Sequence, residues 1–299
     1  MIRIGTGAVR AEFLTYGAAL HRLHVGAHQV VAGLPDLAAY RAGSGYHGAI
    51  VGPVANRICG AQAMIDDQLW RFVPNEGTML LHGGTTGLHG RDWDVADHGP
   101  DHVRFALDLA HCEGGFPGMR RIEAQYLVEG LTLRLELVAT TDRPTLMNLS
   151  SHVYWNLTGR KNLEGHRLQI TADRYTPVDA LLSPTGPPKA VTGAMDLRDG
   201  RLLDGGPHYD HNFCLSDTRK ALRPVAWLTA PDAPAMELAT TEPGLQVYDG
   251  GPSMFGVALE PQGWPDAPNR PDYPTVRLAP EDGPLVQATE WRFTLPGGD

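Results

Sequence analysis

The stretch 122-IEAQYLVEGLTLRLELVATT-141 decides the fold class, because apolar and polar residues alternate along both of its arms. Alternation with a period of two places apolar side chains on one face of a β-strand and polar side chains on the other. The pattern breaks at Glu129-Gly130, where glycine favours a turn. In the second arm, one face carries Leu131, Leu133, Leu135 and Leu137. The stretch therefore predicts a β-hairpin with one buried face.

Other segments repeat this pattern over shorter lengths. Residues 103–109 alternate with a period of two, and 63-AMIDDQLWRFVP-74 is typical of a hairpin that turns at Asp66-Asp67. Residues 35–45 predict one short helix. The 35 glycines and 24 prolines are spread evenly, so no linker or change in composition marks a second domain. We therefore expect an all-β protein, with residues 1–299 forming one domain built as a large sandwich of antiparallel sheets.

The composition argues against several classes of partner and location. The formal net charge is −9 and no basic stripe with interleaved aromatic residues is present, so nucleic acid is not an expected partner. The apolar runs are shorter than the roughly 20 residues that cross a bilayer, and the N-terminus lacks a secretion signal. The cysteines are odd in number, far apart and without a CxxC motif, which favours a reducing, cytoplasmic location. They are Cys59, Cys112 and Cys214.

The sequence gives no support for three other kinds of functional motif. The segment 43-GSGYHG-48 matches G-x-G-x-x-G in letters, but it lacks the strand and helix that a dinucleotide site requires on either side. No G-x-S-x-G motif is present, so a hydrolase serine has no support. The 13 histidines show neither HExxH spacing nor a cysteine partner. We therefore expect no metal, nucleotide or redox cofactor.

Seven segments combine an unusual polar residue with turn residues, as ligand-facing loops and strand ends do. Each segment taken alone also fits a surface turn, a loop cap or a rim salt bridge. They are 52-GPVANRI-58, 80-LLHGG-84, 113-EGGFPG-118, 148-NLSSHVYWNL-157, 209-YDHNF-213, 243-PGLQVY-248 and 258-ALEPQGWPDAPN-269.

In this order, the segments resemble the signature segments of the galactose mutarotase (aldose 1-epimerase) family. The family patterns NRI, LHGG, EGFPG, DHNF and GLQ-x-Y are recognisable, as are the longer patterns around His152 and Glu260. The match runs from about residue 50 to residue 293, where the tail resembles the family's closing strand. The resemblance implies an isomerase with a galactose mutarotase-like supersandwich, a large β-sandwich whose concave face holds a monosaccharide.

The resemblance also implies roles for individual residues. His152 is similar to the histidine that acts as general acid toward the sugar's ring oxygen, and Glu260 is similar to the general base on the anomeric hydroxyl. Five further residues match positions that hold the sugar hydroxyls and the ring oxygen: Asn56, Arg57, His82, Asp210 and Gln246. Asn148 and Asn156, which flank the His152 segment, are expected to support the cleft structurally.

These residue types suit the chemistry of anomer exchange. A proton leaves the C1 hydroxyl while another reaches the ring oxygen, the ring opens, the C1–C2 bond rotates, and the ring closes with the two roles exchanged. A histidine with a pKa of about 6.5 suits this exchange, whereas a glutamate with a pKa of about 4.3 stores a proton poorly. We therefore expect Glu260 to lie in a partly desolvated cleft with Asp210 near the sugar. The arrangement to test is whether His152 and Glu260 face opposite edges of one sugar-sized cleft.

Some positions depart from the family pattern and are expected to affect which sugar is preferred. They are Pro53, Val153, Pro261 and Trp264. An aromatic side chain can stack on a sugar face or pack in the core, and both roles are open for three residues. The candidates for stacking are Trp155, Trp264 and Tyr248.

Three alternative functions remain open from the sequence. An enzyme acting on hexose 6-phosphates would need two or more basic side chains near the phosphate, and Arg57 and Arg91 lie in motif loops. A non-catalytic sugar-binding protein on the same fold would not need His152 and Glu260. A glycosidase or lyase would place two carboxylates, such as Asp210 and Glu260, on either side of a bond. The sequence predicts neither the preferred aldose nor the oligomeric state.

Overall fold

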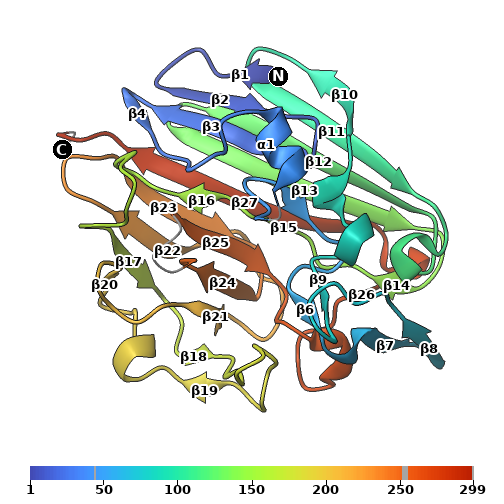
Figure 1. Cartoon of the computed structure of the whole chain (residues 1–299). Helices are drawn as coiled ribbons and strands as arrows, with labels where there is room; N and C mark the ends of the chain where they lie inside the picture. Colours follow the sequence, from blue (N-terminus) through green and yellow to red (C-terminus); the bar gives the residue numbers. More distant parts are fainter. Residues whose placement is uncertain (44, 251–254, 298–299) are drawn as a thin grey trace.

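The computed structural model describes residues 1–43, 45–250 and 255–297, and nearly all of its regular structure is β-strand (Figure 1). Within these residues the one α-helix is α1 (Leu37–Ala42), which confirms the helix predicted over 35–45. It begins at Asp36, whose carboxylate accepts a hydrogen bond from the Ala39 N–H at 2.9 Å and so satisfies a helix-end donor. No helix in the described part of the chain is long and apolar enough to cross a membrane.

A nine-stranded antiparallel sheet spans the molecule, and the 122–141 hairpin lies within it. The hairpin consists of β12 and β13, and its turn contains Gly130 with φ of 58°, a conformation that glycine adopts without strain. Both predicted arms are therefore confirmed. In order across the sheet the strands are β10 (Asp94–His98), β11 (His102–Leu109), β12 (Arg120–Glu129), β13 (Thr132–Thr141), β27 (Leu285–Thr294), β23 (Ala235–Thr240), β22 (Arg223–Thr229), β17 (Arg167–Ile170) and β20 (Arg201–Leu202).

The two faces of this sheet differ as the alternation predicts. On the inner face, Leu133 of β13 lies opposite Trp291 of β27, and both side chains are fully buried. On the outer face, Arg134 lies opposite Glu290 and forms an ion pair with it at 3.1 Å. A strand displays successive side chains on opposite faces, so the Leu-x-Leu pattern alone determines which face becomes core.

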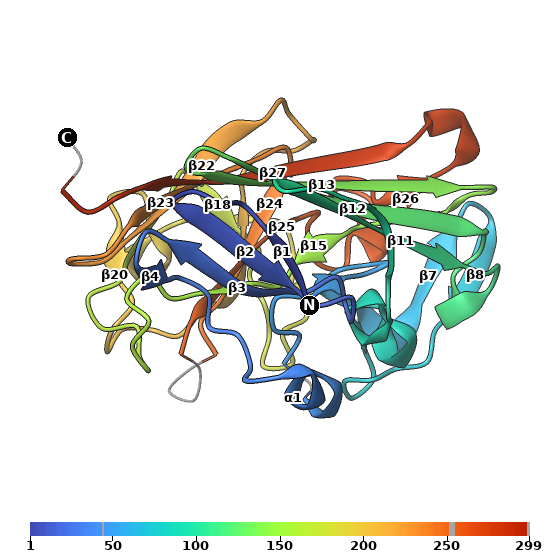
Figure 2. The same cartoon turned by 90° about the horizontal axis from the view of Figure 1, so that it is seen from above.

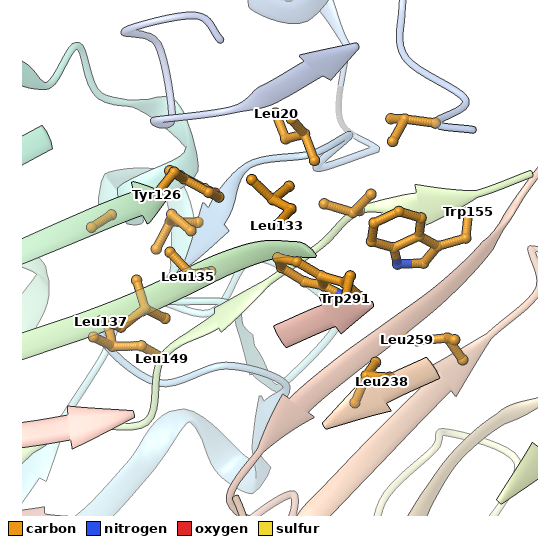
Figure 3. Close-up of a cluster of buried hydrophobic side chains, with 14 of the residues drawn as sticks. Leu20, Tyr126, Leu133, Leu135, Leu137, Leu149, Trp155, Leu238, Leu259 and Trp291 are labelled. Carbon is orange, nitrogen blue, oxygen red and sulfur yellow. The ribbon is translucent and has the colours of Figure 1, made fainter. Parts of the chain in front are cut away.

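Two smaller sheets pack on the inner face and complete the sandwich (Figures 1 and 2). Phe13 packs on Tyr126 with ring centroids 4.4 Å apart, and Trp155 packs on Trp291 at 5.3 Å, as Figure 3 shows for the second pair. The four-stranded sheet consists of β1 (Ile2–Ile4), β2 (Val9–Phe13), β3 (Leu20–Val25) and β4 (His28–Gln29). The six-stranded sheet has the order β16 (Tyr154–Trp155), β25 (Val257–Gln262), β24 (Gly244–Tyr248), β21 (Asp210–Cys214), β18 (Arg174–Tyr175) and β19 (Lys189–Ala190). The all-β sandwich prediction is confirmed.

Short two-stranded pairs hold the remaining motif segments in place. The predicted hairpin at Asp66-Asp67 is confirmed as β7 (Gln62–Ile65) and β8 (Gln68–Arg71). The other pairs are β5 (Ile50–Val51) with β15 (Ser150–Ser151), β6 (Arg57–Ile58) with β9 (Leu80–Leu81), and β14 (Thr145–Leu146) with β26 (Arg277–Leu278). The largest hydrophobic cluster includes residues from β1 through β27, and the single domain over residues 1–299 stays a prediction.

Candidate active site

The six-stranded sheet builds one wall of a cavity from alternate residues of its central strands. Gln246 of β24 lies opposite Glu260 of β25, and Asn212 of β21 lies opposite Gln246 on the other side. Residues directly opposite each other share a face of the sheet, so these polar side chains form a row. The neighbouring residues Val247 and Leu259 point to the other face and are part of the core. The period of two thus separates core from cavity within a single strand.

The cavity has a volume of about 480 Å³, within the range of small-molecule sites. Six of the seven residues expected at a sugar site line it: Asn56, Arg57, His82, His152, Asp210 and Glu260. The seventh, Gln246, does not line the cavity, and its Nε2 donates a hydrogen bond to Asp210 Oδ1 at 2.5 Å. The structure therefore brings together residues from six of the seven motif segments.

His152 and Glu260 lie side by side rather than at opposite edges of the cavity. The distance from His152 Nε2 to Glu260 Oε1 is 3.6 Å, and the side chains are only 4% and 2% exposed. The opposite-edge arrangement is therefore wrong for this protein. The adjacent arrangement suits the chemistry, because the ring oxygen and the anomeric hydroxyl oxygen are bonded to the same carbon and must be reached together.

The environment of Glu260 favours its protonated form. Burial raises the pKa of Glu260 well above its usual value, the charge on Asp210 raises it further, and Arg57 only partly opposes them. Glu260 Oε2 is buried and forms no hydrogen bond with described residues, and the same holds for Gln246 Oε1. Unpaired buried oxygens of this kind are rare, and Glu260 lines the sugar-sized cavity, whereas Gln246 lies beside it on the neighbouring strand. Glu260 is desolvated, as expected, and shares the cavity lining with Asp210; that Asp210 lies near the sugar stays a prediction.

The environment of His152 differs from the expectation of an ordinary histidine. Burial lowers the pKa of His152 to about 3, and the charges that His47 and His89 carry when protonated lower it too. Burial therefore favours the neutral imidazole of His152, whose pKa lies below the value of about 6.5 for an ordinary histidine. Burial thus favours a neutral His152 beside a protonated Glu260, an arrangement in which the two groups together hold one transferable proton.

His82 is held in a single tautomer. Its Nδ1 accepts a hydrogen bond from the Asn56 N–H at 3.0 Å, so its proton resides on Nε2. Asn56 presents this N–H from a left-handed conformation with φ of 61°, which asparagine tolerates better than most residues. Burial and the nearby His152 lower the pKa of His82 well below its usual value. His82 is therefore a neutral hydrogen-bond donor toward the cavity.

This tautomer also bears on whether the site suits a metal ion. His82, His152 and Glu260 each place one ligand-type atom within 4.8 Å of the others, and imidazole with carboxylate is a set that zinc accepts. An imidazole that binds a metal through Nε2 carries its proton on Nδ1 and donates it to an acceptor. His82 Nδ1 instead faces a backbone N–H. The donor set therefore fits proton transfer and hydrogen bonding better than metal coordination.

Arg57 is fixed by two carboxylates. Strand β6 pairs Arg57 with Leu81 of β9, which places it beside the LLHGG segment. Its Nε and Nη2 donate to the two carboxylate oxygens of Glu76 at 2.6 and 3.0 Å, and Nη2 lies 3.7 Å from Asp210 Oδ2. Burial alone would lower the pKa of Arg57, but Glu76 and Asp210 outweigh burial and raise it. Arg57 is therefore permanently charged and rigidly oriented.

Sequence reasoning missed several residues that line the cavity, chiefly Tyr46, Glu76 and Tyr154. The Tyr46 ring lies 4.6 Å from that of His82 and 5.6 Å from that of His152, measured between centroids. It belongs to the 43–48 segment that fails as a nucleotide motif, of which Ser44 lies outside the described residues. Tyr154 follows His152 by two residues, so strand alternation places both on one face; that signal was present in the sequence.

Asn148 and Asn156 support the structure from outside the cavity, as expected. Asn148 Oδ1 accepts the Gly263 N–H at 2.6 Å, and its Nδ2 donates to Ala55 O at 3.5 Å. It thereby ties the loop before Asn56 to the end of the strand that carries Glu260. Asn156 Nδ2 donates to two carbonyls of the loop that follows it, at 2.6 and 3.0 Å.

The positions that depart from the family pattern do not line the cavity. Val153 and Trp264 are buried in hydrophobic clusters, and Pro53 and Pro261 are likewise absent from the lining. Their expected influence on the preferred sugar therefore has no direct contact to support it. Of the three stacking candidates, Trp155 and Trp264 are core residues, whereas Tyr248 lines the cavity.

Comparisons with known proteins identify the family of this chain. A family model described as aldose 1-epimerase matches residues 1–282. The chain is 32% identical over 315 residues to the galactose mutarotase of Bos taurus, covering 95% of this chain and 90% of that protein. It is also 32% identical over 264 residues to the aldose 1-epimerase of Escherichia coli (strain K12), covering 79% and 76% of the two chains.

The solved structures of related proteins share the fold. A GalM/aldose epimerase homologue from C. elegans superposes with a TM-score of 0.91 at 28% identity, covering 98% of both chains. A galactose 1-epimerase from Lactobacillus acidophilus NCFM superposes with a TM-score of 0.85 at 23% identity, covering 98% of this chain and 93% of that one. The predicted galactose mutarotase-like architecture is therefore confirmed. The chain belongs to the aldose 1-epimerase family.

Proposed function

We propose that this chain is a mutarotase, an isomerase that interconverts the α and β anomers of a free aldose such as galactose or glucose. The observation that carries the proposal is the buried pair of His152 and Glu260, 3.6 Å apart in a sugar-sized cavity. Its two members have pKa values shifted in opposite directions by burial, so that they share one proton. The names of the relatives, galactose mutarotase and aldose 1-epimerase, support the same activity.

The shared proton accounts for both halves of the reaction. With the proton on His152, Glu260 is a carboxylate; it takes the proton of the C1 hydroxyl while His152 donates its own to the ring oxygen. The bond between C1 and the ring oxygen breaks, and C1 becomes an aldehyde. The pair is then neutral, with the proton on Glu260, which is the arrangement that burial favours. After rotation about C1–C2, Glu260 returns its proton to the aldehyde oxygen, and His152 takes the proton of the hydroxyl that closes the ring.

The other predicted residues bind and orient the sugar in this proposal. His82 donates from Nε2, since its Nδ1 is occupied by the Asn56 N–H. Arg57 presents the rest of its guanidinium group to a hydroxyl or to the ring oxygen, and Asp210 accepts from hydroxyls. Gln246 holds Asp210 in place through its hydrogen bond at 2.5 Å. Asn56 is the remaining polar residue proposed to contact the sugar.

Anomer exchange measured in variants tests the proposal. Freshly dissolved single anomers of several aldoses are followed by polarimetry or NMR with wild type, His152→Ala and Glu260→Gln. Positioned acid and base groups each contribute about 10²–10⁴-fold, so both variants should lose most of the acceleration. Rates near wild type in either variant would contradict the assignment. The sugar that reacts fastest identifies the preferred aldose.

The alternative functions receive less support. Arg91, the second candidate for binding a phosphate, forms an ion pair with Glu113 and does not line the cavity. A binding protein without catalysis would not require the buried pair, and incubation with oligosaccharides tests for glycosidase or lyase activity. We also propose a role in carbohydrate metabolism in a reducing, cytoplasmic location, for which the three free cysteines are the support.

A further inference from the structure

Glu76 is held at the cavity by a rigid turn. The Glu76 N–H donates to Met79 O at 3.2 Å, and the Met79 N–H donates back to Glu76 O at 2.9 Å. The side chain of Asn75 forms two hydrogen bonds with the backbone of Leu81, at 2.7 and 3.1 Å. Leu81 in turn pairs with Arg57. The turn is therefore fixed to the strand beside Arg57, and the Glu76 carboxylate has a defined position.

The Glu76 carboxylate occupies the side of Arg57 that an anionic ligand would need. A guanidinium group binds a carboxylate or phosphate most strongly through two parallel N–H donors. Arg57 already gives Nε and Nη2 to Glu76 in this way. Glu76 is 38% exposed at its side chain and lines the cavity, so it also faces an entering ligand.

Apart from Arg57, the ionisable groups of the described cavity lining that can carry a charge at neutral pH are acidic, although burial favours the protonated form of Glu260. Asp210 and Glu260 are the other ionisable carboxyl groups of the lining, and Arg57 is its one arginine or lysine among the described residues. Burial keeps His82 and His152 neutral by lowering their pKa values. An acid group on a sugar would therefore meet carboxylates without a free cation to pair with.

We propose that Glu76 is a specificity-determining residue that makes this cavity selective for neutral aldoses and rejects aldoses that carry an acid group. The proposal rests on the proposed function only in taking an aldose as the ligand. Glu76 acts in two ways: it occupies the two-donor edge of Arg57, and it repels a second negative charge. Removing its charge while keeping its shape should release Arg57 for the anion.

The test compares galactose with galacturonic acid, in which the C6 hydroxymethyl group is replaced by a carboxylate. Anomer exchange of both sugars is measured by NMR with wild type and Glu76→Gln, and their dissociation constants are measured by calorimetry. The glutamine keeps an oxygen that accepts a hydrogen bond from Arg57. We expect the ratio of kcat/KM for galacturonic acid to that for galactose to rise by about tenfold or more in the variant, equivalent to about 1.4 kcal/mol.

Glu113→Gln is the matched control. Glu113 also forms an ion pair with an arginine, Arg91, but neither residue lines the cavity. The substitution changes the net charge of the protein by the same amount as Glu76→Gln. It should leave the ratio of the two sugars within about twofold, because the charge it removes is not next to the ligand. Added salt should reduce the discrimination of wild type more than that of Glu76→Gln, since screening weakens repulsion between charges.

Each outcome decides the proposal. A ratio that rises in Glu76→Gln and not in Glu113→Gln supports it. A ratio unchanged in Glu76→Gln, or a wild type that accepts both sugars equally, overturns it. If wild type accelerates anomer exchange of neither sugar, the proposed function fails, and the ratio of the two dissociation constants still decides the role of Glu76. Glu76→Ala, measured in the same way, separates loss of charge from loss of the hydrogen bond to Arg57.

Discussion

His152 Nε2 lies 3.6 Å from Glu260 Oε1, in a place where burial disfavours a charge on either group. The two residues are separated by more than 100 positions in the chain and meet because β16 pairs with β25. Burial moves their pKa values in opposite directions, that of His152 downward and that of Glu260 upward, and so favours a neutral histidine beside a protonated glutamate. The first two predictions follow from this relationship.

The rate of anomer exchange should show no inflection near pH 6.5. An ordinary histidine changes its charge there, but the pKa of His152 is lowered to about 3 by burial. We expect kcat/KM to stay constant within about twofold between pH 5.5 and 7.5 and to fall only at higher pH, where the pair loses its proton. Polarimetry with subtraction of the buffer-catalysed rate measures this profile. A titration centred near 6.5 would show that His152 is accessible to water.

Glu260→Gln should make the protein more stable while it abolishes most of the activity. Because the pKa of Glu260 is raised in the folded state, the group favours folding fully below its unfolded pKa of about 4.3 and progressively less as pH rises. Glutamine carries no such penalty, so the variant should gain about 1–2 kcal/mol at pH 7 and little at pH 4. Urea unfolding at the two pH values measures the difference. An equal gain at both would mean that ionisation is not its cause.

Asn148→Ala should lower both stability and activity, whereas Asn156→Ala should lower stability alone. Each substitution leaves buried backbone groups without a partner, at a cost of about 1–3 kcal/mol. Only Asn148 ties the Asn56 loop to the Glu260 strand, and small displacements of reacting groups cost up to about 10²-fold. Unfolding curves and kcat of both variants are compared with wild type. Equal kcat values for the two variants would remove the positioning role of Asn148.

Substitution by alanine should lower the free energy of unfolding much more at Leu133 than at the adjacent Arg134 of β13. Leu133 is fully buried beside Trp291, so Leu133→Ala should cost about 2–5 kcal/mol. The side chain of Arg134 is 39% exposed on the outer face, where ion pairs contribute little, so Arg134→Ala should cost under about 1 kcal/mol. Denaturant unfolding distinguishes the two. Similar losses would mean that the outer face of the sheet is also packed.

The alternation of apolar and polar residues predicted strands and their buried faces, because this property depends only on neighbouring residues in the chain. The alternation around Leu133 identifies both the strand and its buried face. The motif residues His152 and Glu260 were recognised by resemblance, and alternation around Leu259 would have shown which face of β25 carries the carboxylate. Neither pattern shows that the six motif residues at the cavity meet in one place, because that depends on strand pairing over long separations.

The position of Glu76 and the low pKa of His152 depend on tertiary packing, which local sequence patterns do not describe. Glu76 reaches Arg57 only because Asn75 anchors its turn to β9 and β9 pairs with β6. The low pKa of His152 follows from burial by several segments, and no pattern near residue 152 predicts its extent. Tyr46 lies in a glycine-rich segment whose letters match a nucleotide motif, and no local pattern shows that its ring packs against those of His82 and His152.

The strand β25 places Leu259 in the core and Glu260 in the cavity, one residue apart. A shift of register by a single residue exchanges the two faces of a strand. An insertion or deletion of one residue in β25 would thus put a carboxyl group among the buried tryptophans and a leucine beside His152. A change of one residue in the length of β25 should therefore abolish the site unless a β-bulge absorbs it, whereas a loop can change length without exchanging the two faces of the strand.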